Sequence, residues 1–353
     1  MNSKLLHKDV QSYINDNLKT DISKLLFKGS PFKDISIQEL VIQIDAKKRC
    51  IKKLPTWFQT TNICYPNKIN IEQTSSERTA LYKSKLISGD LLIDLTGGFG
   101  VDAFYFSKKF KQVIHCEHNH ELSEIAAHNF SQLNADIKTI SGDGLAFLQH
   151  QNQLFDWIYI DPSRRSDAKG KVFVLTDCIP NIPDNLDLLF KYTTNIMIKA
   201  SPLLDITNSI DELSHVKEIH VVALENEVKE LLFILKKDYS GSIHLKTVNL
   251  KKENSQHFNA VYKKQMEATF SEPLNYLYEP NSAILKAGLF NEVSSQLKIH
   301  KLHINSHLYT SNELIDFPGR RFKIQHISSY DKKQLKQLIP SKKANITVRN
   351  FPE

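Results

Sequence analysis

The stretch Leu92-Ile-Asp-Leu-Thr-Gly-Gly-Phe-Gly-Val-Asp102 decides the fold of this protein. An apolar run ends in Asp94, and a turn rich in glycine follows it directly. Glycine permits positive φ angles and lets a ligand approach the backbone, because no Cβ stands in the way. The stretch therefore predicts a buried strand that ends in an acid and a tight ligand-binding loop that opens a helix, with the loop residues Thr96, Gly97, Gly98 and Gly100.

Short apolar runs alternate with helix-like stretches on both sides of this loop. The strand-like runs are 91–95, 113–117, 137–140, 157–161, 196–199, 219–224 and 242–250. The helix-like stretches are 103–110, 121–133, 144–150 and 227–237. Near-continuous apolar strands that alternate with helices are typical of a mostly parallel sheet covered on both faces. The sequence therefore predicts an α/β fold with a Rossmann-like domain over residues 71–265.

The regions that flank this domain have other patterns. Residues 1–70 carry apolar side chains three and four positions apart, which predicts a small helical N-terminal domain. Residues 266–353 mix short strand-like and helix-like runs, which predicts a small α+β region that is incomplete at its end. A chain of 353 residues is long enough for several domains.

Composition limits the class of protein. The chain has neither a run of about 18 apolar residues nor an N-terminus of the secretory type, so we expect a cytoplasmic protein without a membrane partner. The four cysteines are widely spaced and predict reduced thiols. The cluster His115-Cys-Glu-His-Asn-His120 could suggest zinc, but neighbours on a strand point to opposite faces. No metal site is predicted.

Positive charge is concentrated near the C-terminus. The net charge is +7, and residues 251–353 hold 16 Lys and Arg against 9 Asp and Glu, which leaves 30 against 30 before them. A basic module beside a neutral one favours a polyanionic partner such as RNA, because Lys and Arg neutralise phosphates. A lysine-rich surface that only keeps the protein soluble is the alternative.

Two further acids follow predicted strands. Glu117 ends the run 113–117, where a carboxylate can accept both hydroxyls of a ribose, and Asp143 follows the run 137–140. The spacing of Gly98 and Gly100 also fits the dinucleotide fingerprint of NAD enzymes, but Asp94 would set negative charge beside a pyrophosphate. The acids therefore favour a nucleoside cofactor with a cationic end. A glycine turn that binds nothing remains the alternative.

The run 157–161 ends in a second candidate motif. Open α/β sheets bind ligands at the carboxyl ends of their strands, so the predicted reaction centre contains Asp161, Pro162, Ser163 and Arg164. The guanidinium group of Arg164 suits phosphate or carboxylate recognition, and an ion pair with a nearby acid is its structural alternative.

A serine-rich segment precedes the first strand of the domain. Ser76 can cap a helix that has Glu77 in its first turn, which is the structural interpretation. The functional interpretation places Ser76 and Glu77 over the bound cofactor. The sequence leaves both open.

Together these motifs resemble those of class I methyltransferases that use S-adenosylmethionine (SAM). Asp94, Gly98 and Gly100 resemble their motif I, whose acid helps to orient the ammonium group of SAM. Asp143 resembles the acid that contacts the adenine amino group, and the segment from Asp161 resembles motif IV beside the transferable methyl. The resemblance implies SAM as cofactor.

The candidate motif IV departs from the known patterns. Ser163 and Arg164 stand where amino-methylating members carry a second proline and an aromatic residue. Members that make 5-methyluridine need a nucleophilic cysteine in the next motif, and the corresponding stretch 197–205 has none. Cys178 is the nearest thiol, without neighbours that would activate it.

The resemblance extends over nearly the whole chain. Glu72-Gln-Thr-Ser-Ser-Glu77, Asp161-Pro-Ser-Arg-Arg165, Lys199-Ala-Ser-Pro202 and Ala344-Asn-Ile-Thr-Val-Arg-Asn-Phe-Pro352 resemble a family of bacterial class I methyltransferases with a C-terminal THUMP-like domain. It implies a ferredoxin-like unit near residues 270–315, a THUMP-like unit after it, and RNA, either tRNA or rRNA, as substrate. The alternatives are a non-catalytic RNA-binding protein on this scaffold and an enzyme that methylates a small molecule or a protein.

Overall fold

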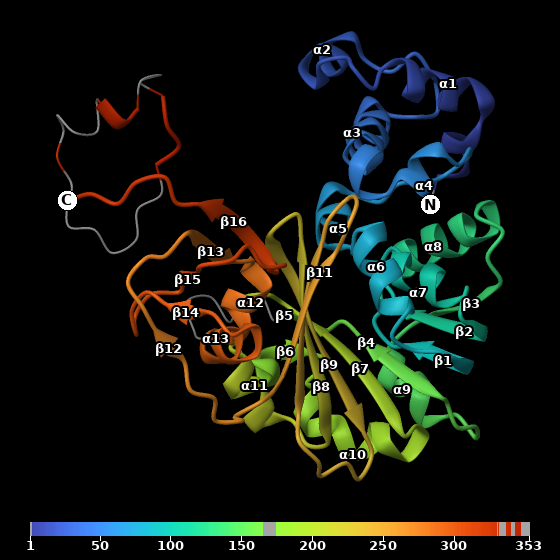
Figure 1. Ribbon diagram of the computed structural model, residues 1–353. Helices are drawn as coiled ribbons and strands as arrows, with labels where there is room; N and C mark the ends of the chain where they lie inside the picture. Colours follow the sequence, from blue (N-terminus) through green and yellow to red (C-terminus); the bar gives the residue numbers. More distant parts are fainter. Residues whose placement is uncertain (1, 165–173, 330, 332–336, 340–342, 347–353) are drawn as a thin grey trace. The chain divides into compact units, whose positions relative to one another are not determined.

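The computed structural model describes residues 2–164, 174–329, 331, 337–339 and 343–346. The chain divides into two units, Met1–Lys263 and Lys264–Glu353 (Figure 1). Among the described residues, no helix combines the length and the apolar character needed to cross a membrane.

The first unit begins with short helices. They are η1 (Ser3–Leu6), α1 (Lys8–Asp16), α2 (Ile22–Lys28), α3 (Ile37–Lys53), α4 (Pro55–Gln59) and α5 (Lys68–Gln73). The longest, α3, starts at a capping box in which the Ser36 hydroxyl accepts from the Glu39 N–H and the Glu39 carboxylate accepts from the Ser36 N–H. Such a cap stabilises a helix by about 1 kcal/mol. The buried face of α3, with Leu40 and Ile44, packs on α1 and α2.

A nine-stranded sheet follows in the order β11-β10-β8-β9-β7-β4-β1-β2-β3. Its strands are β1 (Gly89–Asp94), β2 (Phe110–Glu117), β3 (Ile137–Ser141), β4 (Trp157–Ile160), β7 (Asn195–Ala200), β8 (Val216–Leu224), β9 (Glu227–Lys236), β10 (His244–Leu250) and β11 (Gln256–Val261). Strands β3, β2, β1, β4 and β7 are mutually parallel, and only β9 and β11 run against their neighbours. The predicted mostly parallel α/β sheet is confirmed.

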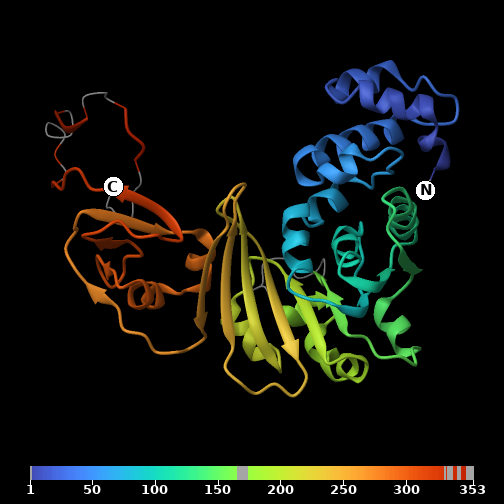
Figure 2. The ribbon, with the colours of Figure 1, turned by 45° about the vertical axis from the view of Figure 1, so that its right-hand side comes forward.

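Helices (Figure 2) and a small two-stranded sheet complete this unit. They are α6 (Glu77–Ser84), α7 (Val101–Phe106), α8 (His120–Gln132), α9 (Gly144–Gln149), η2 (Leu175–Asp177), α10 (Ile182–Tyr192), α11 (Ile206–Glu212) and the two strands β5 (Ser163–Arg164) and β6 (Cys178–Ile179). Side chains of α6, α7 and α8 share one core with the face of the sheet that carries Leu92, Val113 and Met197.

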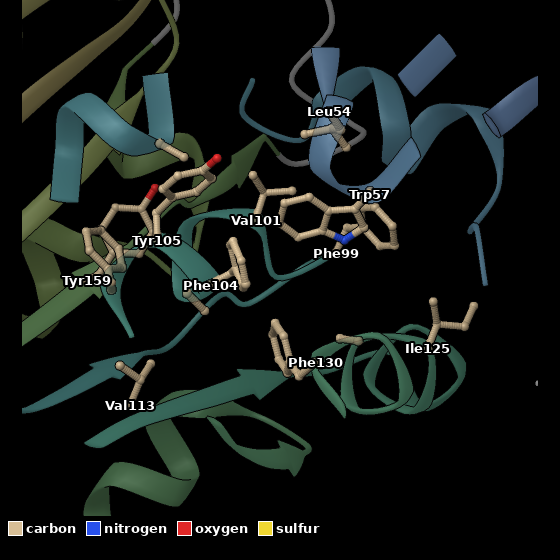
Figure 3. Packing of buried hydrophobic residues seen from close by; sticks show 14 of the residues in the cluster. Leu54, Trp57, Phe99, Val101, Phe104, Tyr105, Val113, Ile125, Phe130 and Tyr159 are labelled. Carbon is tan, nitrogen blue, oxygen red and sulfur yellow. The ribbon is translucent and has the colours of Figure 1, made fainter. Parts of the chain in front are cut away.

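This core also includes the N-terminal helices. Trp57 on α4 is fully buried and packs edge-on against Phe104 of α7, with ring centroids 5.0 Å apart. Figure 3 shows the indole of Trp57 beside Phe99 and Val101, at the start of α7. Helix α4 is therefore packed directly on the segment that follows the glycine loop.

The predicted helix over 227–237 is wrong, because this segment is strand β9. Glu225 and Asn226 both have positive φ angles, +50° and +67°, which close a tight hairpin between β8 and β9. Two-residue turns of this kind match the twist of antiparallel strands. Residues 230–235 are all buried in the middle of the sheet, so the apolar run lacks the alternation that would have indicated a strand.

The second unit is a small α+β structure, as predicted. Its sheet has the order β12-β14-β15-β13-β16. Its elements are β12 (Thr269–Phe270), β13 (Tyr276–Pro280), α12 (Ser282–Ala287), α13 (Phe290–Leu297), β14 (His300–Lys301), β15 (Tyr309–Ser311) and β16 (Gly319–Lys323). Tyr278 and Tyr309 are fully buried and pack on Phe317.

The glycine loop between β1 and α7 fits closely over rings beneath it. A Cβ on Gly97 would lie 2.2 Å from Nε2 of the buried His115, and a Cβ on Gly100 would lie 2.3 Å from Cζ of Phe130. Gly98 and Gly100 have φ angles of +58° and +83°, but a Cβ on Gly98 would meet no atom closer than 3.9 Å. The loop is therefore closed on the side of the rings and open at Gly98.

This geometry predicts unequal costs for two alanine substitutions. Gly100→Ala should lower the free energy of unfolding by about 2 to 4 kcal/mol, because a positive φ and a clash with Phe130 add together. Gly98→Ala should cost only about 1 kcal/mol, since only the positive φ is unfavourable there. Urea unfolding of both variants checks this, and equal losses would contradict the packing of the loop.

Candidate active site

Three of the predicted acids follow neighbouring strands at one edge of the sheet. Asp94 ends β1, Glu117 ends β2, and Asp161 follows β4, which pairs with β1 on its other side. The chain continues from β1 to β2 and β3 on one side and returns to β4 on the other. Such a point of reversal leaves a crevice at the carboxyl ends of the strands, where open α/β sheets bind ligands.

Thr96 joins two of these acids. Oδ1 of Asp94 accepts from the N–H of Thr96 at 2.9 Å, and Oγ1 of Thr96 accepts from the N–H of Asp161 at 2.6 Å. Asp94 is 1% exposed, and its burial, together with the charges of Asp102 and Asp161, raises the pKa of its carboxyl well above the ordinary value. A cation placed beside Asp94 would offset this unfavourable charge.

Glu117 and Asp143 accept hydrogen bonds from backbone N–H groups, and Glu117 does so from the glycine loop as well as from its own. The Glu117 carboxylate accepts from the N–H of Gly98 at 2.8 Å and from the N–H of Asn119 at 2.7 Å, one on each oxygen. Asp143 caps α9 through Oδ1, which accepts from the N–H groups of residues 145 and 146. Each carboxylate keeps lone pairs for hydroxyl or amino groups of a ligand.

Ser76 and Glu77 make structural contacts. Ser76 caps α6 by accepting from the N–H of Thr79 at 3.2 Å. The buried Glu77 accepts from the N–H of Thr56 at 2.6 Å, from the Thr56 hydroxyl at 2.7 Å and from the Tyr105 hydroxyl at 2.8 Å. The capping interpretation therefore accounts for the geometry of both residues, and their contact with a cofactor stays a prediction.

The candidate acceptor site contains a cation that the sequence analysis did not assign. The Lys199 ammonium, on β7 next to β4, donates to Oδ2 of Asp161. Burial alone would lower the pKa of Lys199, but Asp161, Asp102 and Glu230 together raise it above its ordinary value. Ser163 and Arg164 form β5 and pair with β6, while the Arg164 side chain and Arg165 lie outside the described residues.

A buried charge network lies next to this pair. The Lys83 ammonium of α6 is 0% exposed and donates to both oxygens of Glu230 on β9, at 2.7 and 2.8 Å. It also lies 3.2 Å from Oδ1 of Asp102, at the start of α7. Oδ2 of Asp102 accepts from the hydroxyls of Ser75 and Tyr159, both at 2.8 Å.

The network shifts the pKa values of its two acids in opposite directions. Burial alone would raise the pKa of Asp102, but Lys83 and Lys199 hold it below the ordinary value. Burial keeps the pKa of Glu230 above its own ordinary value despite the same two cations. Lys83 and Glu230 are 147 residues apart in the chain, so no local spacing could have indicated that they meet.

The residues at this edge fit SAM. The carboxylates of Asp94, Glu117 and Asp143 suit a ligand with an ammonium, ribose hydroxyls and an amino group. The backbone at Gly98 is open, so a ligand can lie directly against the loop. These acceptors and the open backbone are compatible with SAM.

Comparisons with known proteins agree with the fold. A protein of Porphyromonas gingivalis W83 described as a candidate methyltransferase is 32% identical, with a TM-score of 0.85 over 100% of this chain and 90% of its own. Partial likenesses include a candidate class I SAM-dependent methyltransferase of Listeria monocytogenes (12% identity, TM-score 0.41, 70% of this chain and 88% of the other). Another is M. capricolum TrmK in complex with S-adenosyl-homocysteine (18% identity, TM-score 0.35, 49% and 71%). No curated protein matches the sequence.

The fold is that of a class I methyltransferase domain, and SAM is the cofactor. Family profiles described as a ferredoxin-like domain and as THUMP domain-like match residues 276–318 and 319–353. The chain belongs to the same family as the Porphyromonas gingivalis protein, a family of SAM-dependent methyltransferases with these C-terminal domains. The resemblance found in the sequence is confirmed.

The raised pKa of Asp94 predicts a gain in stability for Asp94→Asn in the protein without cofactor. An acid whose pKa is raised on folding loses stability as pH rises above its unfolded value of about 4. Asn keeps an acceptor for the Thr96 N–H but carries no charge. At a pH near 8, the free energy of unfolding of the variant should therefore exceed that of the wild type by about 1 kcal/mol or more. The gain should vanish near pH 4.

Urea unfolding at several pH values measures this difference. Calorimetry with SAM should show the opposite effect, namely weaker binding by Asp94→Asn, because the charge would be stabilised by the ammonium of the cofactor. A variant that is less stable at every pH would contradict the account of Asp94.

Proposed function

We propose that this enzyme methylates RNA, either tRNA or rRNA, and that Asp161 and Lys199 form its acceptor site. The observation that carries the proposal is the pair itself, an acid and a cation at the carboxyl ends of β4 and β7, next to the strands that end in Asp94 and Glu117. Class I methyltransferases transfer their methyl group at this edge of the sheet. The THUMP-like match at residues 319–353 and the basic surplus after residue 250 support RNA as the acceptor.

The cofactor-binding residues would divide the work among the strand ends. Bound SAM supplies an electrophilic methyl group. Asp94 faces its ammonium, Glu117 accepts from the ribose hydroxyls, and Asp143 accepts from the adenine amino group. The loop that contains Thr96, Gly97, Gly98 and Gly100 would lie against the ligand, and its backbone is open at Gly98.

The acceptor residues orient the group that is methylated. Asp161 can accept a hydrogen bond from an N–H or O–H of the target, while Lys199, with its raised pKa, stays protonated and fixes the carboxylate. Pro162 and Ser163 shape the site through their backbone, and Arg164 contacts a phosphate or carboxylate. Positioning and the exclusion of water then account for most of the acceleration.

The proposal includes the domain division stated for the sequence. Residues 1–70 form the helical domain, 71–265 the catalytic domain, 266–315 the ferredoxin-like unit and 316–353 the THUMP-like unit. The basic C-terminal region would dock phosphates of the RNA, although part of it lies outside the described residues.

Incubation with radiolabelled SAM and total RNA tests the function. The wild-type protein should label RNA, and Asp161→Ala should lower the rate about 100-fold or more by removing an acceptor contact. Asp211→Ala, at an exposed position of α11, is the matched control and should keep the wild-type rate. Unlabelled RNA beside labelled protein or metabolite would overturn RNA as the substrate.

Substitution of Lys199 tests the acceptor pair separately. Lys199→Met leaves Asp161, Asp102 and Glu230 with Lys83 as their remaining cation, and a lost cation raises the pKa of nearby carboxyls. Turnover should therefore fall about tenfold or more at neutral pH and recover partly at higher pH. Lys199→Arg should stay within about threefold, because the positive charge is kept.

The pH profile distinguishes this role from a structural one. SAM affinity and the thermal unfolding temperature of Lys199→Met are measured beside it. A uniform loss of activity at all pH values, without a shift of the acid limb, would contradict the positioning of Asp161 by Lys199.

A further inference from the structure

A second polar site lies on the same face of the sheet as the charge network, near the opposite ends of the strands. A pocket of about 360 Å³ is lined by the segment just after α6 and by β4, β7, β8, β9 and β10. Its lining residues are Lys85, Leu86, Trp157, Asn195, Lys217, Glu218, Ile234, Lys236 and Lys246. Trp157 and Asn195 begin β4 and β7, whereas Asp161 and Lys199 lie at the other ends of these strands. The pocket is therefore separate from the candidate active site.

The pocket carries a strong surplus of positive charge. Four of its lining residues are lysines, and one, Glu218, is an acid. Glu218 accepts from the Lys246 ammonium at 2.7 Å and lies 3.6 Å from that of Lys217. Within the part of the chain that the structure describes, no carboxylate pairs with Lys85 or Lys236. An anion in the pocket would offset the repulsion among these ammonium groups.

A β-bulge brings two of the charged residues into the same pocket. The pairing of β8 with β9 shifts between Val216 and Glu218, so that Lys217 is an extra residue in β8. Adjacent residues of a regular strand point to opposite faces, but a bulge turns a side chain away from this pattern. Lys217 and Glu218 can thus line the same pocket. In a regular strand, their side chains would point to opposite faces of the sheet.

The remaining walls suit a phosphate that carries a sugar or a base. Trp157, Leu86 and Ile234 provide an apolar side, of which Ile234 is buried and the other two are half-buried. Lysine ammonium groups are compact donors that bind phosphate as point charges, and an indole ring provides a flat surface for a sugar or a base. Few other biological anions combine a high charge with such a planar apolar part.

We propose that this pocket binds a phosphate group of a nucleotide or of an RNA strand. Lys85 and Lys236, which have no acidic partner, supply the positive charge for the phosphate. Lys217 and Lys246, which lie close to Glu218, are the other two lysines of the pocket. The site is on the first unit and does not require that RNA be the methyl acceptor. If the RNA proposal is correct, the pocket extends the RNA contact to the methyltransferase domain itself.

Calorimetry of the full chain with inorganic pyrophosphate tests the site. The variant Lys85→Gln/Lys236→Gln should bind pyrophosphate about tenfold more weakly than the wild type at low salt. Lys251→Gln/Lys252→Gln is the matched control, since it removes the same charge from exposed positions just after β10. It should bind as the wild type does.

Glu218→Gln provides a test of opposite sign. Removal of the single carboxylate should strengthen pyrophosphate binding several-fold, which damage to the fold would not do. The thermal unfolding temperature is measured for each variant. Absence of pyrophosphate binding, an equal loss in the control pair, or weaker binding by Glu218→Gln would each overturn the proposal.

Binding of fragmented total RNA then identifies the source of the phosphate. If an RNA strand uses the pocket, Lys85→Gln/Lys236→Gln should lower the slope of log affinity against log salt by about 1 to 2, while the control pair follows the general loss of charge. If RNA binding is unchanged and pyrophosphate binding is weakened, the site takes a free nucleotide. Failure of the wild type to label RNA would overturn the proposed function but leave the pyrophosphate result intact.

Discussion

The arrangement of the site depends on the ion pairs that the Lys83 ammonium makes with the carboxylates of Glu230 and Asp102. A fully buried ammonium is costly to desolvate, and only close acids with hydrogen bonds offset this cost. Here the acids come from β9 and from the start of α7, while the cation comes from α6. Three separate segments can therefore be buried together only in this one arrangement. Because Asp102 begins the helix that follows the glycine loop, the same contact fixes the end of the loop.

The acids at the strand ends explain why such cations are needed. Burial raises the pKa of Asp94, and the charges of Asp102 and Asp161 raise it further. Lys83 pairs with Asp102 and Lys199 pairs with Asp161, and these two cations offset part of the repulsion among the three acids. The edge of the sheet thus keeps negative charge where a cationic cofactor can bind, at a cost in stability for the protein alone. If SAM binds as proposed, its ammonium would stabilise the charge of Asp94 that burial in the fold disfavours.

The sequence predicted the parts of the site that are local in the chain. The loop from Asp94 to Gly100 was recognisable because its function requires small residues and an acid within a few positions. Lys199 belongs to the motif Lys199-Ala-Ser-Pro202. Its contact with Asp161, however, depends on the pairing of β4 with β7, which the spacing of residues in the sequence does not reveal. Strand β9 was missed because a strand buried on both faces has the same apolar run as a buried helix. Asp161 and Glu117 were placed correctly at the edge because strand ends are defined by short-range patterns.

Helix α6 connects features that otherwise belong to different layers. In its first turn Glu77 accepts from Thr56 of α4, and near its end Lys83 pairs with Glu230. Lys85, just after the helix, lines the pocket with four lysines, here called the lysine pocket. These contacts hold one short helix at both ends, so it cannot shift relative to the sheet without breaking a buried charge pair. The N-terminal helices, the candidate active site and the lysine pocket are therefore parts of one packed body.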